Sequence, residues 1–73
     1  MAMLSAQMLG ELIRQERKRQ KVTQAELAAL SGVGVRFLRE LEHGKESCQL
    51  GLTLDVLQTL GITLEARTRG QHQ

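Results

Sequence analysis

Apolar residues recur at helical spacing along most of the 73-residue chain. Near the start, Met8, Leu9, Leu12 and Ile13 fall on one side of a helix, with charged and amide residues between and beyond them. This pattern predicts a first amphipathic helix over roughly residues 6–20.

The beginning of a second helix is marked by Thr23 and Glu26. A Thr at the N-cap and a Glu at the third helical position satisfy each other's backbone amides, which is the arrangement called a capping box. The pattern predicts a helix that starts at Gln24 and stops at Gly32, since glycine readily takes the left-handed conformation at a helix end.

Two more helices are predicted after short breaks. Apolar spacing resumes within about residues 35–43, whereas residues 45–49 are polar and predict a loop. Leucines at every third or fourth position then predict a fourth helix from Leu50 to Gly61, where a glycine again favours a helix end.

The spacing of the apolar residues changes after the fourth predicted helix, from a helical period to strict alternation. Residues 62–67 alternate apolar with polar positions and include β-branched side chains, as a half-buried strand does, with Ile62, Leu64 and Ala66 on its apolar face. A lone strand leaves backbone groups unpaired, so we expect it to pair with the same segment of a second copy in a homodimer. Residues 69–73 are predicted to be a frayed tail.

Composition narrows the class of protein. The chain is rich in Leu, has one Phe and lacks Pro, Tyr and Trp, which favours a mainly α fold in a single domain over residues 1–73. The lone Cys48 excludes a disulfide scaffold and favours a reducing cytoplasm. We expect no membrane span and no secretion signal. A chain this short is expected to bind rather than to catalyse.

Positive charge is concentrated in the first part of the chain. The net charge is +2, yet residues 14–21 contain Arg14, Arg17, Lys18, Arg19 and Lys21 against the single acid Glu16. A basic region of this kind fits a polyanion partner such as nucleic acid. A solvated helix face has the same composition, so charge alone leaves both interpretations open.

The second and third helices are separated by a short, glycine-containing turn. Helices joined in this way form a helix-turn-helix, whose second helix enters the DNA major groove. The segments from Thr23 to Ala28, from Gly32 to Val33 and from Leu38 to Lys45 resemble the Cro/C1-type (XRE) helix-turn-helix family.

The resemblance covers about residues 9–60 and implies a four-helix domain that binds double-stranded DNA, with its helix-turn-helix unit at 24–43. It also implies which residues meet DNA. Gln24 opens the second helix, where free backbone amides favour a phosphate. The positions that match the groove-facing ones of the family are Gly34, Val35, Arg36, Arg39 and Glu40.

The chemistry of these side chains suits base edges. Arg36 and Arg39 can each donate two hydrogen bonds to the edge of a guanine, and Val35 can contact a thymine methyl group. Glu40 suits the amino group of cytosine, or it pairs with Arg36 four residues earlier. Gly34 departs from the family pattern, which has a small polar residue at this N-cap.

Other basic residues are candidates for phosphate contacts. We expect one or two such contacts from the end of the first helix, where the candidates are Arg14, Arg17, Lys18 and Lys21. Lys45 is a further candidate after the third helix.

The other distinctive residues are expected to be structural. Phe37 is expected to fill the core or an interface, Glu42 to be part of the scaffold, and Cys48 to be a small filler. Because no metal-ligand spacing or catalytic pair is found, we expect no metal, no cofactor and no enzymatic activity.

The segment after the fourth helix narrows the role. From Leu60 to Arg67 the chain is similar to HipB-type antitoxins, whose terminal strands pair across a dimer. This resemblance implies a homodimer that represses its own operon at a palindromic operator and binds a HipA-like serine/threonine kinase toxin. Two alternatives stay open: a stand-alone or phage-type XRE repressor, and an adaptor that binds only proteins. The adaptor would be expected to lack bases such as Arg36 and Arg39.

Overall fold

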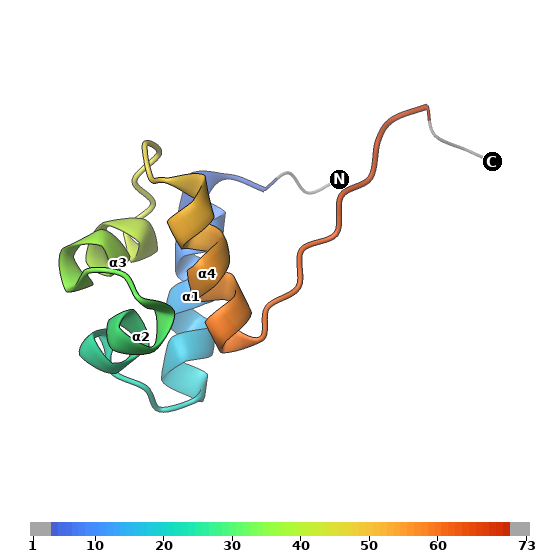
Figure 1. The fold of residues 1–73 in the computed structure, drawn as a ribbon. Coiled ribbons are helices and arrows are strands. Elements are labelled where there is room, and N and C mark those ends of the chain that lie inside the picture. The colour runs from blue at the N-terminus through green and yellow to red at the C-terminus, as the bar shows by residue number, and fades with distance from the viewer. Residues whose placement is uncertain (1–3, 71–73) are drawn as a thin grey trace.

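The computed structural model describes residues 4–70, and these form four helices and no strand (Figure 1). The helices are α1 (Ala6–Arg19), α2 (Gln24–Ser31), α3 (Val35–Glu42) and α4 (Leu50–Leu60). Their bounds agree with the four predicted helices to within about a residue at each end. Within this described part of the chain, no helix combines the length and the apolar character needed to cross a membrane.

The core lies where the four helices meet. α1 and α4 run side by side, and α2 and α3 pack against them on one side (Figure 1). Every helix contributes a fully buried residue: Ile13, Leu27, Leu38 and Leu57 are at most 2% exposed. Burying each such side chain contributes roughly 1.5–3 kcal/mol. The core therefore holds α3 by one face and leaves its other face outward.

α4 ends in a way that uses the residue after it. Gly61 takes the left-handed conformation, and the amide of Ile62 donates to the carbonyl oxygen of Leu57 at 2.9 Å. Ile62 then packs against the core. α2 ends at Gly32 with the same geometry. Both ends are Schellman motifs, in which a glycine and a following apolar residue close the helix.

The strand predicted over residues 62–67 is absent from the described part of this chain. The segment instead leads away from the helices as an extended chain (Figure 1). Ile62 packs against the core of its own chain rather than standing free for a partner, whereas Leu64 and Ala66 are exposed.

The physical reason is that alternation is a local property, whereas a strand forms only where a second edge accepts its hydrogen bonds. Residues 4–70 of one chain contain no other strand that could offer this segment such an edge. Pairing between two copies stays a prediction. Of the predicted tail over 69–73, residues 71–73 lie outside the described residues.

Candidate nucleic-acid interface

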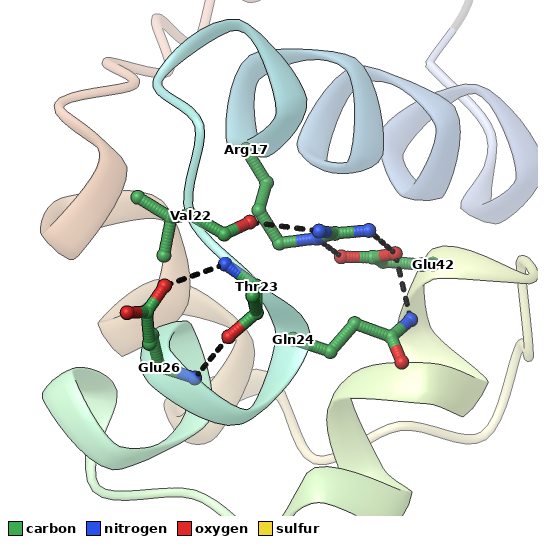
Figure 2. A network of polar contacts seen from close by, with 6 residues as sticks. All are labelled: Arg17, Val22, Thr23, Gln24, Glu26 and Glu42. Carbon is green, nitrogen blue, oxygen red and sulfur yellow. Dashed lines mark hydrogen bonds and ion pairs between the residues drawn. The ribbon is translucent and has the colours of Figure 1, made fainter.

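A buried ion pair fixes α3 against α1. Arg17 donates from Nε to one carboxylate oxygen of Glu42 at 2.6 Å and from Nη2 to the other at 3.1 Å (Figure 2). The two side chains are only 10% and 1% exposed. Arg17 Nη1 also donates to the carbonyl oxygen of Val22 at 2.8 Å, and Gln24 Nε2 donates to Glu42 at 3.0 Å. The network therefore ties together α1, the loop after it, the start of α2 and the end of α3.

Three residues singled out from the sequence belong to this network. Glu42 is part of the scaffold, as predicted. Arg17 is one of the four candidates for the one or two phosphate contacts expected near the end of α1, but its guanidinium is buried and bound within the protein, which leaves the other three. Gln24 lies at the start of α2 as predicted, and its side-chain amide holds Glu42, so its contact with a phosphate stays a prediction.

The start of α2 is fixed by the predicted capping box. The hydroxyl of Thr23 accepts from the amide of Glu26 at 3.0 Å, and the carboxylate of Glu26 accepts from the amide of Thr23 at 2.9 Å (Figure 2). These bonds satisfy two amides that the helix itself leaves unpaired. They confirm the predicted start of α2.

Gly10, which the hydrophobic pattern does not single out, is buried in α1. A Cβ atom at this position would overlap the carbonyl oxygen of Leu41 and lie 2.9 Å from that of Glu42. Glycine therefore permits α1 to approach the end of α3 as closely as it does. The available signal was a glycine inside a predicted helix, which lowers stability by roughly 0.5–1 kcal/mol relative to alanine unless a close approach requires it.

The outward side of α3 carries the residues predicted to face the groove. Leu38 and Leu41 anchor the opposite side in the core. We call the outward surface the recognition face, and its members are Gly34, Val35, Arg36, Arg39 and Glu40. Gly34 is the N-cap and makes no side-chain cap, as expected for a glycine. Val35, Arg36 and Arg39 are all exposed.

Glu40 lies between two cations, Arg36 on the recognition face and Lys45 in the loop after α3. Lys45 Nζ donates to one carboxylate oxygen at 3.1 Å, and Arg36 Nε lies 3.5 Å from the other. The hydrogen bond from Lys45, helped by the positive charges of Lys45 and Arg36, lowers the pKa of Glu40 below its ordinary value. Glu40 is therefore ionised at neutral pH and partly neutralises both cations.

Of the remaining candidates, Arg14 is exposed on α1. Lys18 and Lys21 are exposed at the corner between α1 and α2, and the amide of Lys21 donates to the carbonyl of Lys18 at 3.0 Å. Phe37 packs against the core, which favours the filling role. Cys48 also packs there, and its thiol donates to the carbonyl oxygen of Lys45 at 3.3 Å.

Comparison with known families decides what this arrangement is. Residues 13–66 match the family HTH_3, whose description is helix-turn-helix. The chain belongs to this family, as an XRE-type helix-turn-helix protein. It is 45% identical over 65 residues to the uncharacterized HTH-type transcriptional regulator y4mF of Sinorhizobium fredii (strain NBRC 101917 / NGR234), which covers 89% of this chain and 86% of the relative.

Solved structures show the same helix-turn-helix fold. The HipB–O4 20mer complex and the HipA–HipB–O2–O3 complex each contain a chain that is similar with a TM-score of 0.82. Each comparison covers 94% of this chain and 97% of the other, at 20% sequence identity. The fold is therefore HipB-like, and the protein is a helix-turn-helix transcriptional regulator of the XRE type. In this fold α3 stands at the position of the recognition helix.

Proposed function

We propose that this regulator is a homodimeric repressor that reads a palindromic operator with α3 and serves as a HipB-like antitoxin. The observation that carries the DNA-binding part is the mounting of α3. The Arg17–Glu42 pair and the close approach at Gly10 fix the helix from behind, while Arg36 and Arg39 point outward. A helix that is held in place on its inner side and presents two exposed guanidinium groups suits base readout in a major groove.

Roles divide between base and phosphate contacts. Arg36 and Arg39 read guanine edges, and Val35 meets a thymine methyl group. Four other polar residues hold phosphates, which positions the helix without reading sequence. They are Lys18, Lys21, Gln24 and Lys45.

A dimer follows from the way such helices meet DNA. Two copies of α3 reach the same side of a duplex when the half-sites of an inverted repeat lie one helical turn apart. The extended segment after α4 supports a contact between copies, because its Leu64 is 45% exposed and takes no part in the core. Pairing of residues 62–67 with the same residues of a second copy would cover Leu64 and satisfy the backbone of both segments.

The antitoxin role is supported by the likeness to HipB, which has been solved together with HipA. A HipA-like serine/threonine kinase is accordingly the expected partner, and the pair would act in the cytoplasm at the nucleoid. A stand-alone repressor is the second candidate, because the relative at 45% identity is described only as a transcriptional regulator.

Co-purification of the chain expressed with its neighbouring genes separates the antitoxin from the stand-alone repressor. Retention of a kinase-like protein supports the antitoxin, and elution of the regulator alone supports the repressor.

Titrations on DNA test the division of roles. The duplexes are the region upstream of the regulator's own gene and a scrambled sequence of equal length. Arg36→Ala and Arg39→Ala should each cost roughly 1–3 kcal/mol on the cognate duplex and much less on the scrambled one. Lys18→Ala should instead weaken both duplexes equally and lower the salt slope by about one. Uniform losses for both arginine variants would move the readout to Val35, Glu40 or DNA shape.

The contact between copies has its own test. Leu64→Asp places a charge on the exposed apolar position of the extended segment, and it should shift the sedimentation mass toward a monomer and weaken operator binding. Thr63→Asp, on the neighbouring position of opposite facing, is the matched control. An unchanged dimer with Leu64→Asp argues against pairing through this segment.

A further inference from the structure

The recognition face contains an acidic side chain, Glu40, at a place where binding to the negatively charged DNA would favour a basic side chain. Glu40 is exposed to one third of its side-chain surface and binds Lys45 at 3.1 Å and Arg36 at 3.5 Å. Both partners are cations that the proposed function assigns to DNA. In the free protein, one carboxylate therefore holds two of the groups that DNA requires.

Other acids of the helical part of the chain have different positions. Glu42 is buried and bound to Arg17, so it does not face DNA. Glu26 is bound in the capping box of α2. Glu16 pairs with Arg19 within α1. Glu46 is exposed in the loop after α3. Glu40 is thus the acid on α3 itself that contacts Arg36 and Lys45.

A carboxylate in this position acts differently on different DNA. On any sequence it repels phosphates and competes with them for Arg36 and Lys45. On a duplex that presents a cytosine amino group to it, the carboxylate gains a hydrogen bond that offsets this penalty. Discrimination arises because the penalty is general whereas the compensation depends on sequence.

We propose that Glu40 is a specificity-determining residue that withholds Arg36 and Lys45 from non-cognate DNA and releases them where a base amino group takes their place at its carboxylate. This inference rests on the proposed function. It adds to the readout by Arg36 and Arg39 a residue that lowers the affinity for DNA of the wrong sequence. A helix-stabilising pair at i, i+4 would have the same geometry but would not change the preference among DNA sequences.

The test compares Glu40→Gln with the wild-type chain on the cognate and scrambled duplexes over a range of salt. Gln keeps the shape and removes the charge. Each additional phosphate contact steepens the salt slope by about 0.9, which corresponds to roughly five- to tenfold in affinity at about 0.1 M salt. Affinity for the scrambled duplex should therefore rise by roughly this factor for each cation that gains a phosphate contact, and affinity for the cognate duplex by less than about twofold. The ratio between the two should fall accordingly.

Asp55→Asn is the matched control, because Asp55 is exposed on α4 and the substitution changes the net charge equally. It should shift both duplexes by the same small factor and leave their ratio unchanged. A second variant, Glu40→Gln with Lys45→Met, should lose the part of the gain in salt slope that comes from Lys45 and keep the part that comes from Arg36. A salt slope as steep as that of Glu40→Gln alone would contradict the release of Lys45.

Three results would overturn the inference. Equal gains on both duplexes would show a general charge effect, and a loss confined to the cognate duplex would show a base contact without any withholding. No change on either duplex would show a helix-stabilising pair only. Failure of the proposed function looks different, because then the wild-type chain itself would show no preference for the cognate duplex.

Discussion

Two arginine–glutamate pairs involve α3, and they differ in almost every physical respect. Arg17 and Glu42 are buried, and their closest atoms are 2.6 Å apart in a two-pronged contact. Arg36 and Glu40 are 3.5 Å apart, and the arginine is 87% exposed. The first pair joins residues from α1 and α3, whereas the second lies within one turn of α3.

This difference separates scaffold from readout. A buried pair whose partners are removed from water must keep every hydrogen bond, so it is a fixed part of the fold. An exposed pair gains little from its contact and exchanges readily with water or another anion. The molecule therefore uses one pair to hold α3 in place and leaves the other available for DNA.

The largest expected effect is on the buried pair. Glu42→Gln leaves the guanidinium of Arg17 buried without a counter-charge, and this should lower the free energy of unfolding by about 3–5 kcal/mol. Urea denaturation followed by circular dichroism measures the loss. The double variant Arg17→Met with Glu42→Leu replaces both charges by apolar groups and should recover much of it. A Glu42→Gln variant as stable as the wild type would contradict a structural role for the pair.

Gly10→Ala should have the next largest effect, because the added methyl group meets the backbone of Leu41 and Glu42. Moving α1 away from the end of α3 should cost about 1–3 kcal/mol of stability in the same denaturation assay. Gly51→Ala is the matched control within a helix, since a Cβ there meets open space. It should instead stabilise the protein by roughly 0.5–1 kcal/mol. Similar effects for both variants would argue against a close approach at Gly10.

Lys21→Gly tests the corner beside the buried pair. Lys21 has a φ of 60°, and it is the one non-glycine residue with positive φ among residues 4–70. Glycine relieves this conformation and should raise stability by about 0.5–1 kcal/mol, while removal of the charge weakens binding to all DNA sequences. Lys21→Asn removes the charge but tolerates the left-handed conformation, so it should weaken DNA binding to the same extent. Lower stability in Lys21→Gly would contradict the strain.

The smallest effect is expected from the exposed pair. Glu40→Gln should leave the urea midpoint at pH 7 almost unchanged. The pKa of Glu40 is lowered in the folded chain, chiefly by the hydrogen bond from Lys45, so its contribution is present above the ordinary value of 4.5 and is lost as the pH falls below it. Any difference between the variant and the wild type should therefore shrink between pH 6 and pH 3. A difference that grows on acidification would contradict the lowered pKa.

Local chemistry in the sequence was sufficient for the helices and for the recognition face. Helix ends are set by residues close to them in sequence, here the Thr23–Glu26 capping box and the glycines at 32 and 61. Their effect could therefore be predicted from the sequence. The outward position of Arg36 and Arg39 follows from the helical period once the apolar side of α3 is known.

Tertiary structure decided what depends on partners distant in sequence. Within the basic run over 14–21, the helical period places Arg17 four residues after the buried Ile13, but its ion pair depends on Glu42, which lies 25 residues further on. Gly10 is required by the backbone of α3, which its own neighbours do not reveal. The alternation over 62–67 predicted a strand that this chain alone does not form. Hydrogen bonds and burial across elements depend on which surfaces meet, and a linear pattern records only neighbours within a turn or two.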